Sequence, residues 1–332
     1  MTAVLTRSAA VAAGLAADRL FGEPPAAIHP VALFGKTMQA AEHRLYSNRR
    51  SAGAVYAGLG VIGAAALGRI ISRPRRAVSR FGSQRVSWTA LSAATYVAVA
   101  GRALTESASR VADAASQGDL ALARARLPEL VGRDPSGLGT EEISRAVVES
   151  LAENTVDAVV APAFWGAVAG APGVLAYRAV NTLDAMVGHR SDRYLRFGWA
   201  AARADDFAGW IPARLTAVVV ACSRPASVSR VWRAVRLQAP AHPSPNAGVA
   251  EAAFAAALGC RLGGVNVYGS RVEERPLLGQ GPPASIGDIG RAAALSRDVV
   301  ALLAALLSGP SIIRVMRASR GRGARGNERK DG

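Results

Sequence analysis

Acidic and amide side chains gather at the two ends of one long apolar segment, residues 149–193. At its start, Glu149, Glu153 and Asp157 follow at four-residue intervals, with Asn154 beside them, so on a helix the three acids share one face. Three acids that lead into a segment apolar enough for lipid are costly unless a cation or polar group meets them. This acidic stripe, made of Glu149, Glu153 and Asp157, is therefore the first candidate for a functional site.

A second polar group closes the segment. Asn181 and Asp184 lie about one helical turn apart, and Arg190 follows them. Carboxylates together with arginines suit phosphates that carry Mg²⁺, because hard oxygen ligands hold the metal and guanidinium groups clamp the phosphate. The two polar groups therefore favour chemistry on a phosphate compound with bound magnesium.

Each group also has a purely structural interpretation. The acidic stripe would suit a solvated helix face paired with arginines such as Arg145, and spacing alone favours that interpretation. Asn181 and Asp184 are equally suited to hydrogen bonds between helices. The pair at 205–206 is more typical of a surface than of a metal site. The residues alone leave these alternatives open.

Two proline-rich motifs flank the segment, DRLFGEPP from residue 18 and HPSPN from residue 242. Their polar side chains, with one histidine just beyond the first motif, are Asp18, His29, His242, Ser244 and Asn246. Asn246 is expected to cap a helix that begins near residue 249, and a rigid turn before a helix N-terminus is a ready anion site. Each histidine precedes a proline and, taken alone, is more typical of a turn than of an acid or base.

The composition predicts a membrane protein. Half of the 332 residues are apolar, and the mean hydropathy is positive. The net charge of +16 comes almost wholly from arginine, and no recognised DNA- or RNA-binding motif accompanies it. Basic loops beside membrane spans explain this charge better, so nucleic acid is not an expected partner.

Missing motifs exclude several enzyme classes. No Gly-x-x-x-x-Gly-Lys sequence is present, which excludes a P-loop nucleotide site. No zinc-ligand spacing and no nucleophile elbow appear either. Cys222 and Cys260 are expected to be free thiols.

The pattern predicts an all-α, polytopic membrane protein with four to five hydrophobic spans and amphipathic interfacial helices. The apolar segments are residues 53–71, 86–101, 158–176, 207–222 and 298–313. The helix that carries the stripe should end or kink near Pro162, and the segment after it forms either two shorter helices or a re-entrant element. Residues 224–239 predict a cationic helix on the membrane surface, and residues 261–269 a loop. We expect one catalytic domain, 1–316, and a disordered basic tail, 317–332.

The order of the polar motifs along the chain resembles one known family. DRLFGEPP near the start, GRD at 132–134, ESLAENTVDAVVAPAF from 149, AVNTLDAMVGHR from 179, IPARLTA from 211 and HPSPNAGVAEAAFAAALGCRLGG from 242 are similar to motifs of the CobD/CbiB cobalamin biosynthesis proteins. These proteins are the adenosylcobinamide-phosphate synthases. The resemblance covers nearly the whole chain except its tail.

The resemblance implies a multi-pass enzyme of the cell membrane with its active site toward the cytoplasm. It implies an ATP-dependent amide ligase that joins aminopropanol, or its phosphate, to the free propionate of the corrinoid cobyric acid. ATP with Mg²⁺ would drive the reaction, and other membrane enzymes of the cobalamin pathway are expected partners. Six arginines between residues 69 and 85 predict that this loop is cytoplasmic, which conflicts with a cytoplasmic active site at the other end of the spans.

On this basis each group receives an expected role. Mg²⁺–ATP is assigned to the acidic stripe with Asn154, and the phosphate site is completed by Asn181, Asp184 and Arg190. A substrate phosphate is assigned to His242, Ser244 and Asn246. Asp18 and His29 are expected to serve in acid–base chemistry or corrinoid contacts. The alternatives are a transporter of corrinoid or phosphorylated precursor, against which the lack of an internal repeat weighs, and a non-catalytic membrane scaffold.

Overall fold

The computed structural model describes residues 2–25, 27–73, 80–132, 134–268 and 271–327. The first half of the chain forms α1 (Thr2–Phe21), α2 (Pro30–Leu45), α3 (Arg50–Ile71), α4 (Arg80–Ala98), α5 (Gly101–Ser116), α6 (Leu120–Arg126) and α7 (Thr140–Thr155). The second half forms α8 (Ala161–Leu183), α9 (Tyr194–Phe197), α10 (Trp199–Ser223), α11 (Val228–Leu237), α12 (Ala247–Leu258), β1 (Leu262–Tyr268), β2 (Arg271–Leu278) and α13 (Ile286–Asn327). The all-α prediction is confirmed, with one added hairpin. The end of the predicted tail, residues 328–332, lies outside the described residues, and the division at residue 316 stays a prediction.

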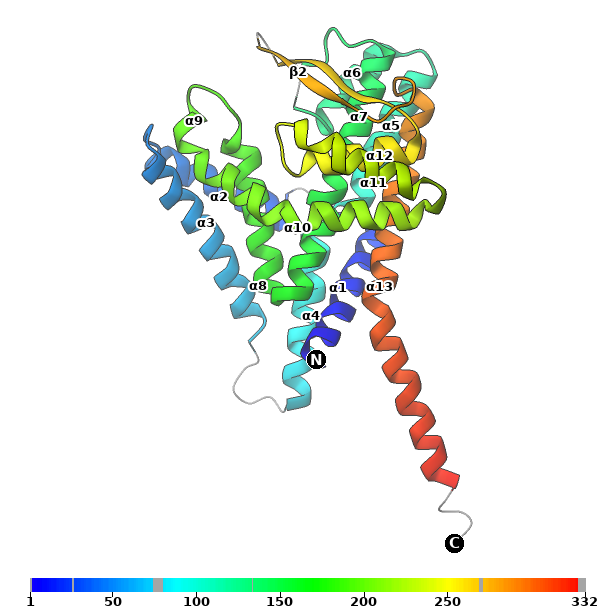
Figure 1. Cartoon of the computed structure of the whole chain (residues 1–332). Coiled ribbons are helices and arrows are strands. Elements are labelled where there is room, and N and C mark those ends of the chain that lie inside the picture. Colours follow the sequence, from blue (N-terminus) through cyan, green and yellow to red (C-terminus); the bar gives the residue numbers. More distant parts are fainter. Residues whose placement is uncertain (1, 26, 74–79, 133, 269–270, 328–332) are drawn as a thin grey trace.

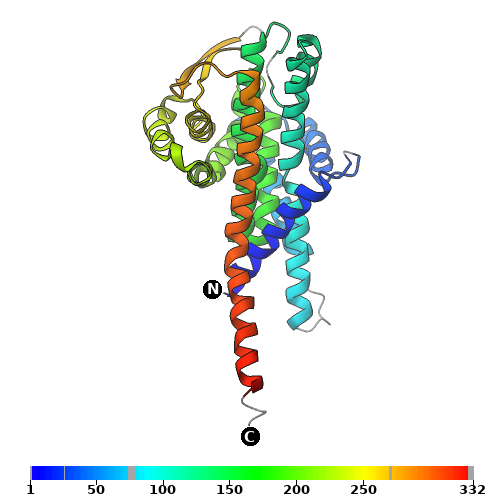
Figure 2. The ribbon, with the colours of Figure 1, turned by 90° about the vertical axis from the view of Figure 1, so that its right-hand side faces the viewer.

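The helices form two stacked parts (Figure 1). At one end, α5, α6, α7, α11, α12 and the hairpin pack together, while α1, α3, α4, α8 and the rest of α13 extend toward the other end. Figure 2 shows α13 running alongside both parts and beyond them. Helix α10 crosses the molecule between the parts, from α3 to α13. At the centre lies α12, which is buried along its whole length because small residues let its neighbours approach closely.

Three helical segments in the described chain are long and apolar enough to cross a membrane. They are α3, the continuous stretch Thr140–Gly188, and Ile286–Gly309 of α13. The predicted spans at 53–71 and 298–313 fall in α3 and α13. The apolar segments at 86–101 and 207–222 fall mainly in α4 and α10. Neither helix is both long enough and apolar enough to cross a membrane, so the described chain has three candidate spans, fewer than the four to five predicted.

The stretch Thr140–Gly188 does not run straight, because it reverses direction inside α8. Gly170 has φ 72° and ψ −158°, and Pro172 begins the returning arm, where its missing N–H needs no partner. Arg7 donates a 2.7 Å hydrogen bond to the carbonyl of Val168 at the end of the first arm. The first arm continues α7 without a break, and the returning arm, 171–183, is about 20 Å long at 1.5 Å per residue. The stretch is therefore a helical hairpin.

The sequence predicts that the helix ends or kinks near Pro162. It does not end there, since the helix continues through this proline, but it is irregular just before it. Residues Val156–Val160, just before this proline, form a π-helical turn. The wider turn changes the hydrogen-bond pattern at the point where the proline lacks a donor, so the chain continues without a break. The reversal lies eight residues farther on, at Gly170.

A β-hairpin replaces the loop predicted after residue 260. Leu262 and Leu278 face each other at its buried base, and a bulge follows where Gly263 and Gly264 have positive φ. Arg145 of α7 donates hydrogen bonds to the carbonyls of Gly263 and Val265. Gly263 and Gly264 interrupt the residue pattern by which a strand is recognised in the sequence. In the fold, the contacts with α7 hold the strand in place.

The helix after the HPSPN motif begins at Ala247, two residues earlier than expected. The N–H groups of Asn246 and Ala247 donate to the hydroxyl oxygen of Ser244, at 3.3 and 3.1 Å. The Asn246 side chain makes no capping hydrogen bond, because its amide donates to the carbonyl of Asp206 at 2.9 Å. Ser244 therefore performs the capping role predicted for Asn246.

Replacement of Gly170 by alanine is expected to destabilise the protein. A side chain at this φ and ψ costs on the order of 1–3 kcal/mol, because the region is open essentially to glycine alone. Thermal unfolding of the purified protein in detergent should show a lower midpoint for Gly170→Ala. The matched control is Gly63→Ala in α3, where an added Cβ meets no atom within 4 Å. Equal unfolding midpoints for the two variants would show that the reversal does not need glycine.

Candidate functional site

Two π-helical turns carry two of the predicted carboxylates. Asp157 lies in the turn Val156–Val160, and Asp184 begins the turn Asp184–Gly188. A π turn inserts one extra residue into a helix and occurs often at functional sites. Because α8 doubles back between the two turns, both carboxylates come to the same end of the helical hairpin.

Hydrogen bonds join this pair of turns to α10. The Tyr177 hydroxyl donates to Asp157 Oδ1 at 3.4 Å, across the helical hairpin. Asn181 Nδ2 donates to Asp205 Oδ1 at 3.4 Å, and Asn181 Oδ1 accepts from Arg178 Nη1 at 3.2 Å. Asp157, Asp184 and Asp205 lie within electrostatic reach of one another on three segments of the chain, and we name them the carboxylate cluster.

The cluster carries more negative charge than its surroundings favour. Burial, followed by the nearby charge of Asp184, raises the pKa of Asp205 from 3.8 to about 7. Burial also raises the pKa of Asp206, while Arg203 and Arg190 oppose this rise. Asp205 and Asp206 are both half-buried, so they are not the surface pair that the sequence favours. A bound cation would relieve the repulsion within the cluster.

The acidic stripe does not act as one unit. Glu149 is buried and accepts a 2.9 Å hydrogen bond from the Gly263 N–H, so it holds the β-hairpin. Glu153 is exposed and lies within electrostatic reach of Arg275 on β2, while Asn154 donates to the Ser150 carbonyl of its own helix. Glu153 also lies within electrostatic reach of Asp157, Asp184 and Asp205, so the solvated-face interpretation does not describe the stripe.

The donor set fits a magnesium ion that arrives with a phosphate, not a closed protein cage. Within the described ranges, no three His, Cys, Asp or Glu side chains gather closely enough to hold a metal ion alone. Mg²⁺ usually takes one or two protein carboxylates, with phosphate oxygens and waters completing its shell. The carboxylate cluster can supply that number. The roles predicted for Glu149, Glu153 and Asp157 as metal ligands stay predictions.

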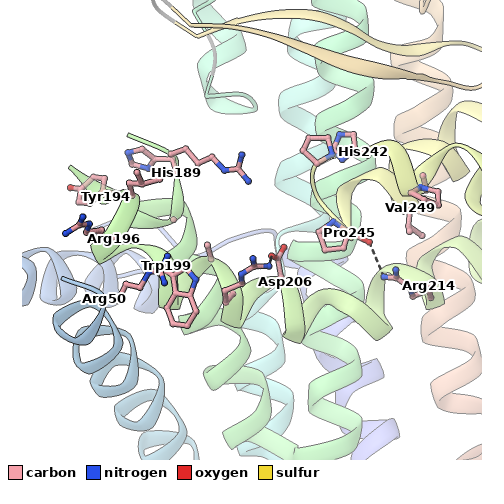
Figure 3. Close-up of a pocket in the computed structure, with 18 of the residues that line it drawn as sticks. Arg50, His189, Tyr194, Arg196, Trp199, Asp206, Arg214, His242, Pro245 and Val249 are labelled. Carbon is pink, nitrogen blue, oxygen red and sulfur yellow. Dashed lines mark hydrogen bonds and ion pairs between the residues drawn. The ribbon is translucent and has the colours of Figure 1, made fainter. Parts of the chain in front are cut away.

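A large basic cavity of about 1460 Å³ lies beside the cluster. Its lining contains six arginines: Arg49, Arg50, Arg190, Arg196, Arg203 and Arg214. The acid in this lining is Asp206, which follows Asp205 of the cluster in the chain. Figure 3 shows His189, Tyr194 and Trp199 on one side of the cavity and His242 and Pro245 on the other, with Asp206 between them. Such a cavity suits an anionic ligand, because guanidinium groups bind phosphates and carboxylates in a fork geometry.

His242 belongs to the cavity wall, but its ring is buried. Its Nε2 lies 3.7 Å from Glu251 Oε2 and 3.2 Å from Arg275 Nη1, and its Nδ1 accepts from the Ser244 N–H at 3.1 Å. Glu251 is itself buried in α12. Sequence reasoning missed both Glu251 and Arg275. The available signal was that Glu251 is the one charged residue of an otherwise apolar helix.

The first proline-rich motif lies away from the cavity lining. His29 caps α2, since its Nδ1 accepts from the Val31 N–H at 3.2 Å, which agrees with the turn interpretation. Asp18 Oδ2 accepts from the Arg102 N–H at 3.1 Å, at the start of α5. Its Oδ1 is buried and has no hydrogen-bond partner among the described residues. The structure brings neither Asp18 nor His29 into the cavity lining, whereas it does place Arg190 and His242 there.

Comparison with known proteins gives the family of the chain. A family described as "CobD/Cbib protein" matches residues 11–296. The chain belongs to the CobD/CbiB family. It is 46% identical over 307 residues to "Cobalamin biosynthesis protein CobD" of Mycobacterium tuberculosis (strain ATCC 25618 / H37Rv), covering 91% of this chain and 95% of that protein. The protein of the same name from Chromobacterium violaceum is 42% identical over 297 residues, covering 89% and 94%.

A further CobD relative, from Geobacter metallireducens, is 42% identical over 274 residues, covering 79% of this chain and 83% of that protein. No solved structure matches the chain. As a member of the CobD/CbiB family, the chain is a protein of cobalamin biosynthesis. The predicted resemblance is confirmed.

Asp205→Asn is expected to stabilise the protein at high pH. The folded state keeps the Asp205 proton up to about pH 7, while the unfolded chain releases it near 3.8. Stability is therefore lost as the pH rises through this window, and at about 1.4 kcal/mol per pKa unit the loss is a few kcal/mol above pH 7. The variant should unfold at a higher temperature than the parent at pH 8, and the gain should shrink toward pH 4.

Magnesium should reduce the gain in unfolding temperature that Asp205→Asn gives at pH 8, because a cation in the cluster neutralises the carboxylate of the parent protein. The matched control is Asp113→Asn on α5, an exposed aspartate outside the cluster. A gain that is the same at pH 5 and pH 8 would contradict the repulsion within the cluster.

Proposed function

We propose that this CobD/CbiB protein is an ATP-dependent amide ligase, an adenosylcobinamide-phosphate synthase. It would join aminopropanol phosphate to the free propionate of cobyric acid. The observation that carries the proposal is the arginine-lined cavity that meets the carboxylate cluster at Asp206. This arrangement, in a family of cobalamin biosynthesis, combines groups for anionic substrates with groups for a phosphate-bound cation.

The chemistry requires two steps. A propionate is a poor acyl donor, so one of its oxygens first attacks the γ-phosphorus of ATP and releases ADP, giving an acyl phosphate. The amine nitrogen then attacks the carbonyl carbon, inorganic phosphate leaves, and the nitrogen loses a proton to a base. Magnesium would neutralise phosphate charge during the transfer.

The protein's own groups suit these steps. The cavity arginines would orient the phosphates and the propionate, since each guanidinium holds two oxygens at once. Asp157 and Asp184 do not line the cavity, but Asp184 lies within electrostatic reach of Asp206 in its wall, so the two would hold the cation-bearing phosphates at the edge of the cavity. Asp205, which accepts a hydrogen bond from Asn181 beside them, would accept a proton from the incoming ammonium group.

The charge of the cavity favours the phosphorylated amine. Free aminopropanol is a cation at neutral pH, and the six arginines would repel it. The phosphate ester carries the negative charge that the arginines attract. The phosphorylated form is therefore the proposed substrate.

The proposed location is the cell membrane, with several passes and the cavity toward the cytoplasm. Helices α1 and α4 pack against each other and beside α13 and α8, so with α3 and α13 they would give four crossings around the helical hairpin. A cytoplasmic cavity gives access to ATP. This orientation places the arginine-rich end of α3 on the opposite side of the membrane, which goes against the positive-inside rule. We give more weight to the need of the cavity for cytoplasmic ATP. Other membrane enzymes of the pathway are proposed partners.

The direct test is product formation by the purified protein in detergent. Cobyric acid, ATP, Mg²⁺ and aminopropanol phosphate should yield the amide, with one ADP formed for each amide bond, as followed by mass spectrometry. Omission of ATP or chelation of Mg²⁺ should abolish the product. Corrinoid uptake by proteoliposomes without amide formation would favour a transporter, and neither activity would favour a scaffold.

Asp157→Asn tests the carboxylate cluster. Loss of one electrostatic group at a transferring phosphoryl centre lowers kcat by on the order of 100-fold. The matched control is Glu106→Gln, which removes a carboxylate from an exposed ion pair with Arg102. Both variants should elute as the parent does in size-exclusion chromatography. Unchanged ATP-dependent turnover in the folded Asp157→Asn variant would remove Asp157 from the mechanism.

A further inference from the structure

Helix α10 carries an exposed apolar face that the proposed reaction does not use. Phe207, Ile211, Val218 and Cys222 follow at intervals of four, seven and four residues, so they lie along one face of the helix. The exposed fractions of the first three are 81%, 51% and 53%, and Cys222 is also exposed. We name these four residues the α10 stripe. Contiguous apolar surface of this kind marks a site of interaction with another phase or molecule.

The α10 stripe lies opposite the packed face of the helix and borders its charged face. Ala213, Thr216 and Val220 are fully buried against the body of the protein. Arg203 and Arg214, which line the basic cavity, lie one turn before Phe207 and Val218, so the edge of the stripe meets the edge of the cavity. The rest of the stripe has no occupant within the described chain.

Each end of α10 contacts a candidate membrane span. In both spans, the contact lies where charged residues give way to an uncharged run. At the start, the Arg50 guanidinium lies 5.3 Å from the centroid of the Trp199 ring. Arg50 is the first residue of α3, and no charged residue follows it before Arg69. The beginning of α10 therefore lies at the depth where α3 would enter the membrane.

At the other end, Arg224 Nη2 forms a 2.8 Å ion pair with Asp298 Oδ2 of α13. Asp298 is the last charged residue of α13 before an uncharged run that extends to Arg314. Within the candidate span Ile286–Gly309, the end of α10 thus lies at the boundary between the charged half and the uncharged half. Figure 1 shows α10 crossing between these two helices.

We propose that α10 lies along the membrane surface, with the α10 stripe among the lipid acyl chains of one leaflet. A helix fixed at these two boundaries cannot cross the bilayer and must run along its surface. Trp199 and Trp210, which are 42% and 52% exposed, suit the headgroup layer, where tryptophan is enriched. The exposed apolar side chains of α3, such as Leu59 and Ile62, extend the same lipid-facing surface.

This placement fixes the depth of the basic cavity. Trp199, Arg203 and Arg214 line the cavity from the same helix, so its floor lies at the level of the lipid headgroups. A large amphipathic ligand adsorbed to the membrane surface would reach the cavity along that surface. The membrane placement itself holds whatever reaction the cavity performs.

The test measures the surroundings of the α10 stripe in lipid nanodiscs by spin labelling. The native thiol of Cys222 is labelled in the full chain without any substitution, since Cys260 is buried. Phe207→Cys and Ile211→Cys, each in a Cys222→Ala background, extend the measurement. Collision rates with oxygen, which partitions into lipid, are compared with those of a water-soluble nickel complex.

Two reference positions calibrate the result. Both are made in the Cys222→Ala background, so that each protein carries one label. Ile62→Cys on α3 is the lipid reference, because Ile62 is 69% exposed on a candidate span. Gln117→Cys at the end of α5 is the water reference, because Gln117 is exposed outside the spans. The α10 stripe should give an oxygen-to-nickel ratio close to that of Ile62→Cys and several-fold above that of Gln117→Cys.

Two results would overturn the proposal. A ratio equal to that of Gln117→Cys would place the stripe in water. Low collision rates for both reagents, together with spin–spin broadening that disappears on dilution with unlabelled protein, would show that a second copy covers the stripe. Because native Cys222 needs no substitution, a poorly folded variant would not prevent a decision.

Discussion

The reversal of the chain at Gly170 is the constraint on which the rest of the structure depends. It brings Asp157 and Tyr177, twenty residues apart in the chain, into hydrogen-bond contact across a short helical hairpin. The returning arm then delivers Asp184 to the same end. Without this reversal, the stretch Thr140–Gly188 would be one long helix with its polar ends far apart. The apolar part of the hairpin is thus the support of the site, and its glycine is the position that permits it.

Charge is separated within the site rather than neutralised. The carboxylate cluster repels itself, as the raised pKa of Asp205 indicates, while six arginines line the adjoining cavity. Asp206 lies at the boundary, and its contact with Arg203 is long, at 3.6 Å. Two regions of opposite charge, side by side, are well suited to a ligand that carries both phosphates and a cation. Helix α10 supplies groups to both regions.

Several features were predictable from the sequence because they depend on neighbours along the chain. The helical class, the apolar segment within α3, and the break in the segment after residue 158 follow from hydropathy and from glycine and proline. The family followed from the order of its polar motifs. Asp157, Asn181 and Asp184 were predicted from residue type to contribute to one site, and in the fold Asn181 donates to Asp205 of the cluster at 3.4 Å. Periodicity and composition carry this information without the fold.

The tertiary structure alone decided how the predicted residues divide their work. Glu149 and Glu153 share a helix face, yet one holds the β-hairpin and the other stays exposed, because only the first meets Gly263. Asp205 entered the site because α10 packs against the helical hairpin. Glu251 and Arg275 meet at His242 from separate elements. The sequence by itself determined which residues suit helices, lipid and phosphate, whereas the packing of distant segments determined which charges met, and electrostatic energy depends on that proximity.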